Sequence, residues 1–113
     1  MIPNNVKRKI PSYLKKFQNI KSIDIQPTDK KDKKYKAIIT DKNGKIKTIH
    51  FGYKDSYTWS DFVADGKPSS LRDEMKKKKY AYKARASKII NKQGEYTYLI
   101  PETANSLAYW LLW

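Results

Sequence analysis

Two short alternating segments, residues 35–40 and 45–51, meet at the pair Asn43-Gly44. Both segments are rich in β-branched residues and have residues that alternate between two faces, which is the two-residue period of a strand. Asn-Gly is a favoured turn pair in tight hairpins because both residues tolerate positive φ angles. The segment therefore predicts a β-hairpin. The first strand would present one face made of Tyr35, Ala37 and Ile39.

The whole chain has 113 residues, which is enough for one domain with a modest core. We expect the α+β class: an antiparallel sheet built on the central hairpin, packed by an amphipathic basic helix and a C-terminal aromatic helix. Residues 1–34 are predicted to form a basic N-terminal arm and a short helix, and residues 35–113 the core domain. Within the arm, residues 1–10 are expected to have no core of their own. Residues 22–34 contain either an edge strand with a linker or a linker alone.

The sequence predicts four further elements after the hairpin: a loop, a basic helix, a short strand and a last helix. Gly52 would end the second strand, and residues 53–70 would form an aromatic-rich loop. A basic helix from Leu71 would be capped by Ser69 or Ser70. Its apolar stripe would consist of Leu71, Met75, Tyr82, Ala86 and Ile89. Residues 96–100 would form a short strand, and a last helix would open at Pro101 with its core-facing residues Ala104, Leu107, Trp110 and Leu111.

The net charge of +14 is unevenly distributed. Residues 1–36 contain 11 Lys or Arg against three acidic residues, and residues 72–92 contain nine against two. Two basic blocks on one small domain are typical of proteins that bind polyanions. The competing interpretation is compositional, because a genome rich in A and T inflates the content of Lys, Asn, Ile and Tyr.

The cations of these blocks are the candidate contacts to nucleic acid or another polyanion. They are Lys7, Arg8, Lys9, Lys15, Lys16, Arg72, Lys76, Lys77, Lys78, Lys79, Lys83, Arg85 and Lys88. Lysine is a hydrated point charge, whereas bidentate reading of base edges requires arginine, of which there are three. We therefore expect phosphate contacts without sequence specificity. Tyr53, Tyr57 and Trp59 would either stack on bases or pack in the core or an interface, with packing favoured for Trp59.

Several kinds of chemistry are disfavoured. The chain has no cysteine, and its only histidine, His50, lies in an alternating strand where a structural role is expected. Asp55, Asp61 and Asp65 could hold a divalent cation, but their spacing matches no EF-hand, and turn or helix-cap roles are favoured. A nuclease using Asp41, Glu95 and a lysine is conceivable, although nothing in their spacing requires it. We expect no metal, no cofactor, no membrane span and no catalytic activity.

The C-terminal stretch PETANSLAYWLLW is strongly apolar. Tyr109, Trp110, Leu112 and Trp113 would form either the last core element or an exposed patch that contacts a partner protein. Both alternatives stay open from sequence alone, and we take these four residues as the candidate protein interface.

The motifs also occur in a recognisable order. A hairpin ending in His-Phe-Gly, an aromatic-Asp loop, a basic helix with Tyr-x-x-Arg and the terminal Leu-Leu-Trp together resemble a family of small basic proteins found in large DNA viruses and tailed phages. The match covers residues 35–113. Its positions are His50, Phe51, Gly52, Asp61, Phe62, Tyr82, Arg85, Thr103, Ala104, Ser106, Leu112 and Trp113.

The chain departs from that family at three places. Arg85 is followed by Ala86, where the family often has histidine, which further disfavours catalysis. Asn105 replaces the glycine of the terminal motif, and residues 66–70 form an apparent insertion. The resemblance implies a viral, virion-associated setting and carries no particular biochemical activity.

These observations together predict a non-enzymatic, virus- or phage-encoded virion protein, synthesised in the host cell interior, that binds DNA or another polyanion. The alternative is a minor capsid or cement protein whose lysines meet acidic capsid surfaces. A remote third possibility is a nuclease or nucleic-acid-modifying enzyme.

Overall fold

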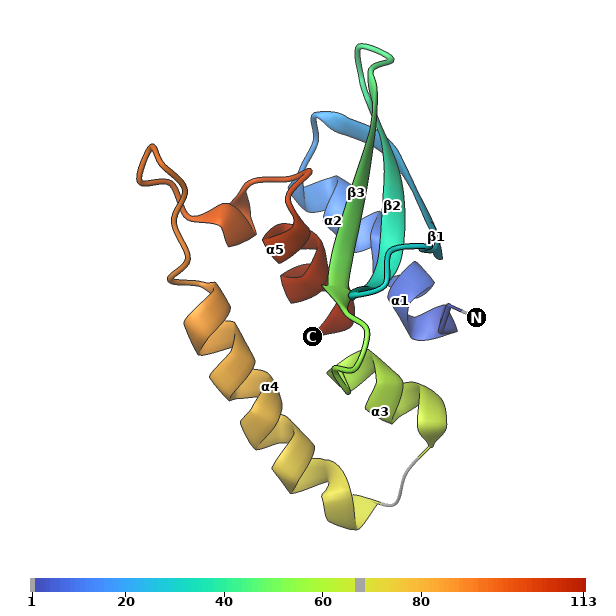
Figure 1. The fold of residues 1–113 in the computed structure, drawn as a ribbon, viewed down its shortest axis with the longest axis vertical. Helices are drawn as coiled ribbons and strands as arrows, with labels where there is room; N and C mark the ends of the chain where they lie inside the picture. Colours follow the sequence, from blue (N-terminus) through green and yellow to red (C-terminus); the bar gives the residue numbers. More distant parts are fainter. Residues whose placement is uncertain (1, 67–68) are drawn as a thin grey trace.

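The computed structural model describes residues 2–66 and 69–113, and Figure 1 shows their arrangement. The helices and strands are α1 (Asn4–Arg8), α2 (Ile10–Lys16), β1 (Ile20–Pro27), β2 (Lys33–Asp41), β3 (Ile46–Tyr53), α3 (Trp59–Asp65), α4 (Arg72–Ala86) and α5 (Ala104–Leu107). The shorter turns are two 3-10 helices, η1 (Ser69–Leu71) and η2 (Thr97–Leu99), and one π-helical segment, η3 (Ala108–Leu112), which continues α5. One antiparallel three-stranded sheet, with helices packed against one of its faces, confirms the α+β prediction. None of the described helices is both long and apolar enough to cross a membrane.

The predicted hairpin is confirmed as β2 and β3. Tyr35 pairs with Phe51 and Ala37 with Ile49, so these side chains share one face of the sheet. Tyr35, Ala37 and Phe51 are all buried, which is the result that the alternating pattern predicted.

The turn of the hairpin has the chemistry expected of Asn-Gly. Gly44 adopts a φ of 84°, and the Asp41 carboxylate accepts hydrogen bonds from the backbone N–H of Asn43 and of Lys45, both at 2.9 Å. The predicted end of the second strand at Gly52 is wrong, because β3 continues to Tyr53. Gly52 has a φ of 76° and lies inside the strand.

The N-terminal residues are packed into the same core as the sheet, where the sequence suggested an arm, and the predicted short helix is present as α2. Val6 on α1 is fully buried, and Tyr13 on α2 is 2% exposed. The hydroxyl of Tyr13 shares a 2.8 Å hydrogen bond with the hydroxyl of Ser106, which ties α2 to α5. Ile2 and Phe17 join the same hydrophobic cluster. The apolar residues that bury these helices are difficult to recognise among the many basic residues of the sequence. Helices this short need only about one apolar residue per turn to pack against a core.

Residues 20–27 form the edge strand β1, which decides between the two alternatives for this segment. Ile23 pairs with Ile39 and Ile25 with Ala37 of the central strand β2. One face of the sheet therefore collects buried residues from all three strands. Figure 1 shows α2 and the C-terminal helical segment beside this sheet, and their buried side chains complete a single cluster.

The structure contains a helix, α3, within the segment predicted to form an aromatic-rich loop. Thr58 and Asp61 make a reciprocal capping box: the Thr58 hydroxyl accepts from the Asp61 N–H, and the Asp61 carboxylate accepts from the Thr58 N–H at 2.9 Å. Gly66 ends the helix in the left-handed conformation. Phe62 is buried, so the helix covers part of the core. Two positions of the apparent insertion that follows, 67 and 68, lie outside the described residues.

The basic helix is present as α4, but it does not pack along the sheet as predicted. In Figure 1 it lies apart from the strands, beside α3 and the C-terminal segment. Of its predicted apolar stripe Ala86 is buried and Tyr82 is half-buried, whereas Leu71 and Ile89 are 42% and 50% exposed. The predicted N-cap is wrong, because Leu71 and not a serine occupies the N-cap position, and it makes no side-chain capping hydrogen bond.

The short strand predicted at residues 96–100 is wrong. Asn91 accepts hydrogen bonds from the N–H groups of Gln93 and Glu95 and so closes a tight turn. Only an isolated bridge joins Ile90 to Tyr96. The chain then enters the 3-10 turn η2, because no described strand lies beside it to extend the pairing.

The last helix begins after Thr103, whose side chain accepts from the Ser106 N–H, and not at Pro101. Leu107 and Leu111 are fully buried, as predicted, whereas Ala104 is exposed.

The burial of Leu112 and Trp113 decides whether these two residues form part of the core or an exposed patch. Leu112 is fully buried and Trp113 is 5% exposed, so both are core residues and the prediction of an interface at these two positions is wrong. Tyr109 and Trp110 are only half-buried.

Candidate nucleic-acid interface

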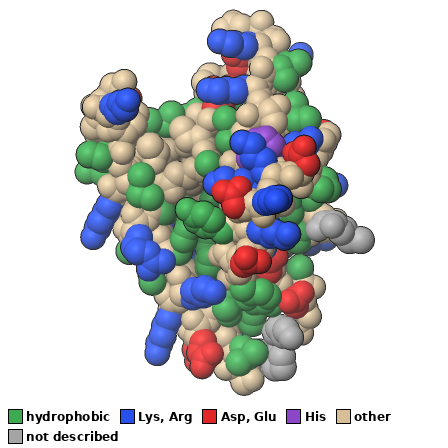
Figure 2. Space-filling model, in the orientation of Figure 1, with side chains coloured by type: hydrophobic (Ala, Val, Ile, Leu, Met, Phe, Trp, Pro, Cys, Tyr) green, Lys and Arg blue, Asp and Glu red, His purple; other side chains and the backbone are tan. Residues whose placement is uncertain are grey.

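The cations of α4 are not neutralised by carboxylates of the described chain. Arg72, Lys76, Lys77, Lys78 and Arg85 are exposed, and Figure 2 shows basic side chains spaced along the helix. Within residues 2–66 and 69–113 the only ion pair shorter than 4 Å is elsewhere, between Lys34 and Asp61 at 2.8 Å. The two acidic residues of α4 lie in its first turn, where they interact favourably with the helix dipole.

One side of α4 forms a surface that we call the lysine–aromatic face, comprising Lys9, Lys16, Arg72, Lys79, Lys83, Trp59, Tyr109 and Trp110. Four of its five cations, all except Lys9, lie over rings contributed by other elements. The Lys79 ammonium is 4.6 Å from the ring centroid of Trp59, and the Arg72 guanidinium is 5.9 Å from it. The Lys83 ammonium is 4.8 Å from the Tyr109 centroid. These distances are within the range of cation–π attraction.

The N-terminal helices reach the same surface. The Lys16 ammonium of α2 lies 4.4 Å from the centroid of Trp110, which Lys83 also approaches at 5.9 Å. The two basic blocks of the sequence, residues 1–36 and 72–92, therefore meet on one face.

The rings of this face are held in place by the fold. The indole N–H of Trp110 donates to the carbonyl oxygen of Tyr98 at 2.8 Å, and Tyr109 packs edge-on against Trp110 with centroids 4.7 Å apart. Trp59 packs on Phe62 at 5.6 Å. The rings remain half-exposed, so they are fixed platforms at the surface.

The ammonium groups of the face repel one another. Burial lowers the pKa of Lys9 to about 8, and the positive charges of Lys79 and Lys83 contribute to this lowering. Burial also lowers the pKa of Lys83, with an additional contribution from Lys79. Three like charges, one from the N-terminal segment and two from α4, thus act on one another. An anion placed among them would relieve this repulsion.

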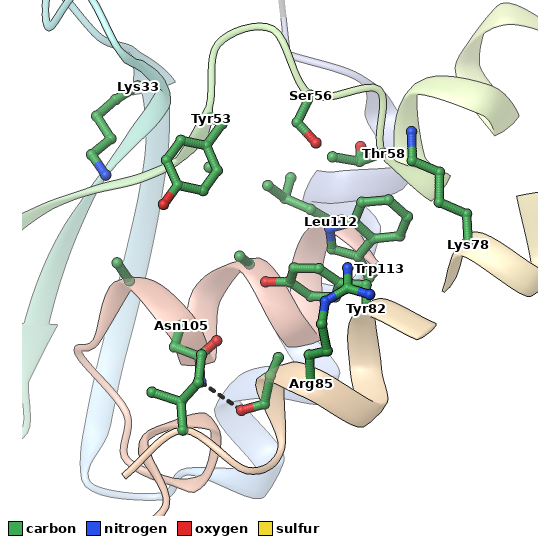
Figure 3. A pocket seen from close by; sticks show the side chains of 15 residues that line it. Lys33, Tyr53, Ser56, Thr58, Lys78, Tyr82, Arg85, Asn105, Leu112 and Trp113 are labelled. Atoms are coloured by element: carbon green, nitrogen blue, oxygen red, sulfur yellow. Dashed lines mark hydrogen bonds between the residues drawn. The ribbon is translucent and has the colours of Figure 1, made fainter. Parts of the chain in front are cut away.

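A groove lies on another side of α4, between that helix, the end of β3 and the C-terminal segment (Figure 3). Its volume is about 480 Å³. Lys78 and Arg85 enter it from α4, and Lys33 enters from β2. Sequence reasoning missed Lys33, because the register that brings the start of β2 opposite α4 depends on tertiary packing.

The predicted polyanion contacts therefore separate into three groups. Lys9, Lys16, Arg72, Lys79 and Lys83 share the lysine–aromatic face, and Lys78 and Arg85 line the groove. The remaining six, which take part in neither set of contacts, are exposed. They are Lys7, Arg8, Lys15, Lys76, Lys77 and Lys88. Of the predicted stacking residues, Trp59 belongs to the face, Tyr53 is 70% exposed in the groove, and Tyr57 bonds to Asp65.

Two of the three carboxylates considered for a cation, Asp61 and Asp65, have other partners. Asp61 caps α3 and pairs with Lys34, and Asp65 accepts a 2.6 Å hydrogen bond from the Tyr57 hydroxyl, which raises the pKa of that phenol to about 12. Across the described ranges no three acidic or histidine side chains converge on a possible metal position. His50 shares a 2.7 Å hydrogen bond with Thr28 on the solvent face of the sheet.

Comparison with known proteins gives one informative relative. Over 108 residues the chain is 35% identical to the "Uncharacterized protein L851" of Acanthamoeba polyphaga mimivirus, and the match covers 96% of each chain. The chain belongs to the family of this mimivirus protein. No protein-family model matches it, and no solved structure does.

Membership of the L851 family confirms the viral part of the resemblance described above, since the relative is virus-encoded. The match extends into residues 1–34 as well, because it covers nearly the whole chain. Six of the positions on which the resemblance was based line the groove beside α4. They are Gly52, Tyr82, Arg85, Ala104, Leu112 and Trp113.

Proposed function

We propose that this protein binds nucleic acid through its backbone phosphates, without sequence specificity, on the lysine–aromatic face. The observation that carries the proposal is geometric: Lys16 of α2 and Lys79 and Lys83 of α4 lie over aromatic rings of one face, with no carboxylate paired to any of them among the described residues. Mutually repelling ammonium groups are costly in the free protein and become favourable when phosphates lie between them.

The chemistry of the face supports phosphate contacts more than base reading. Its charges are four lysines and one arginine, and lysine binds phosphate as a point charge. The half-exposed rings of Trp59, Tyr109 and Trp110 offer flat surfaces to sugars or bases, which adds affinity without selecting a sequence. The relative contributions of charge and stacking can be separated by their dependence on salt.

We also propose a binding role in place of a catalytic one. Asp41 is engaged in the hairpin turn, Glu95 bonds to Asn91 in another turn, and His50 is engaged with Thr28. These groups support different elements and do not converge on a common point. Magnesium-dependent cleavage of DNA by the purified protein would contradict this part of the proposal.

The setting that we propose is the virus particle, where a basic protein of this kind would neutralise packaged nucleic acid. The support is the virus-encoded relative together with the excess of positive charge. Quantitative mass spectrometry of purified particles of the encoding virus should detect the chain. Absence from the particles would restrict the binding role to the infected cell.

The test of binding is fluorescence anisotropy of a random-sequence duplex across a salt series. The triple substitution Lys16→Gln, Lys79→Gln, Lys83→Gln removes three cations of the face. We expect the log–log salt slope to become shallower by about 2 to 3, and affinity near 0.1 M salt to fall roughly 100-fold.

The matched control is Lys42→Gln, Lys45→Gln, Lys47→Gln, which removes the same charge from exposed lysines of the hairpin. If both variants weaken binding equally, only net charge matters and the face is not the site. If the wild-type protein does not bind at low salt, its cations face acidic protein surfaces instead, as the cement alternative predicts.

A further inference from the structure

The groove beside α4 combines an apolar floor with aromatic walls. Leu112, Ala108 and Ala104 of the C-terminal segment form part of the floor. Tyr53 projects from the end of β3 and is 70% exposed, so most of its ring surface has no protein cover. Tyr82 stands opposite, on α4, stacked on Trp113. A flat aromatic ligand would find matching surfaces here.

The charged residues lining the groove are all positive. Lys33 lies 5.1 Å from the centroid of the Tyr53 ring, and Lys78 and Arg85 enter from the α4 side (Figure 3). No Asp or Glu is among the residues that line this groove in the described chain. The groove is therefore complementary to a ligand that is both flat and anionic.

One polar side chain of the groove retains an unused acceptor. The Nδ2 atom of Asn105 donates to the carbonyl oxygen of Ala86 at 3.0 Å and to the Thr97 hydroxyl at 2.8 Å. These two bonds fix the carboxamide. Its Oδ1 atom accepts no hydrogen bond from a described residue, and it is turned toward the groove in Figure 3. An amino or imino group of a nucleobase is a suitable donor.

We propose that this groove receives an unpaired nucleotide of a single strand, with its base between Tyr53 and the Tyr82–Trp113 side and its phosphates near Lys33, Lys78 and Arg85. This inference rests on the proposed binding of nucleic acid. The volume of about 480 Å³ is within the range of sites for small ligands. In a duplex both faces of each base are covered by neighbours, so only an unpaired base can enter.

The position of α4 links this groove to the lysine–aromatic face. Lys78 and Lys79 are consecutive on the helix, yet Lys78 lines the groove while Lys79 lies over Trp59 on the face. A strand whose phosphates contact the face can therefore cross α4 and place one base in the groove. The expected consequence is a preference for single strands over duplexes.

The experiment compares a 20-nucleotide oligothymidylate with a duplex of the same length, by anisotropy at one salt concentration. In Tyr53→Ala we expect the ratio of single-strand to duplex affinity to fall about 10-fold, the usual cost of losing one stacked base. Tyr80→Ala is the matched control, because Tyr80 is 65% exposed on α4 outside the groove. An oligonucleotide with a central 2-aminopurine should be quenched by the wild-type protein more than by Tyr53→Ala.

The outcomes distinguish this inference from the proposed function. If the triple lysine variant of the face loses affinity for both ligands while Tyr53→Ala leaves the ratio unchanged, the groove inference alone is overturned. If the triple variant binds both ligands normally, the proposed function fails. If free adenosine monophosphate competes for the groove as well as the oligonucleotide does, the groove is a site for a free nucleotide, and the inference is wrong.

Discussion

The phenol ring of Tyr82 stacks on the indole of Trp113, with ring centroids 4.7 Å apart and planes inclined by 18°. Tyr82 is in the C-terminal half of α4, and Trp113 follows η3. Burial raises the pKa of this phenol to about 12. The stack, together with the hydrogen bond from Asn105 to the carbonyl of Ala86, attaches the basic helix to the core.

Replacing Tyr82 with alanine should detach α4 in part. We expect Tyr82→Ala to lower the free energy of unfolding by about 2 kcal/mol, because a half-buried aromatic ring and its stacking partner lose contact. Hydrogen exchange should accelerate in α4 more than in the sheet. Tyr80→Ala, two residues away and 65% exposed, should change stability by less than about 0.5 kcal/mol. Equal effects of the two substitutions would show that the stack does not hold the helix.

Gly52 is required where the C-terminal segment crosses β3. Its φ is 76°, and a Cβ atom would lie 3.0 Å from the Leu112 side chain and 3.0 Å from the Cβ of Lys34. We expect Gly52→Ala to cost about 3 kcal/mol of unfolding free energy, from backbone strain and overpacking together.

A substitution at Gly44 measures the cost of backbone strain without the cost of overpacking that Gly52 adds. It has a φ of 84°, but a Cβ atom added at that position would have no neighbouring atom within 4 Å. Gly44→Ala should therefore cost only about 1 kcal/mol, the strain of the left-handed conformation. Urea denaturation of both variants checks the difference. If the two substitutions cost the same, the close approach of Leu112 has no energetic consequence.

Local signals explain which elements can be predicted from the sequence. The hairpin follows from alternation and Asn43-Gly44, which act within about ten residues of one another. The helix α3 is not predicted from the sequence, although Thr58 and Asp61 form its capping box. The usual sequence signature of a capping box has Glu or Gln at the N3 position, where this chain has Asp61. The N-terminal helices resemble an arm in the sequence because α1 and α2 each bury a single side chain, Val6 and Tyr13.

The sequence predicts which basic residues could belong to the site, but it does not predict how they are arranged in space. The sequence identifies Lys9 and Lys83 as basic residues, yet their mutual repulsion exists only because the N-terminal helices and α4 fold toward each other. Burial of Leu112 and Trp113 likewise depends on how η3 meets β3 and α4, and a short apolar terminus is equally compatible with a partner. Relations of this kind arise from packing between distant segments, which no local pattern encodes.

The cap of α3 gives a third prediction. Thr58 is 1% exposed, and its hydroxyl contacts the Ser60 hydroxyl at 2.7 Å and the Asp61 carboxylate at 3.0 Å. Thr58→Val keeps the volume but removes these bonds, so we expect a loss of about 2 kcal/mol in unfolding free energy. Thr58→Ser retains the hydroxyl and should lose less than about 1 kcal/mol. The prediction is wrong if serine is no better than valine in thermal or urea unfolding.

Lys9 gives a prediction that joins electrostatics to function. Because its pKa in the free protein is about 8, a growing fraction of the protein lacks this charge as the pH rises through 8. Phosphate near the ammonium group favours the charged form and raises the pKa in the complex. Binding therefore takes up protons between the two pKa values. By linkage, affinity must fall with rising pH in that window, by at most about tenfold per unit.

We accordingly expect duplex affinity to decrease between about pH 7.5 and 9, at constant ionic strength, with proton uptake visible by calorimetry in buffers of different ionisation enthalpy. Lys9→Arg is the decisive variant, because arginine keeps its charge throughout this range. Its affinity should stay nearly constant with pH, apart from a smaller contribution from Lys83, whose pKa is also lowered by burial. If Lys9→Arg shows the same pH dependence as the wild-type protein, the nucleic acid does not reach Lys9. The phosphates would then have to be sought on another part of the basic surface.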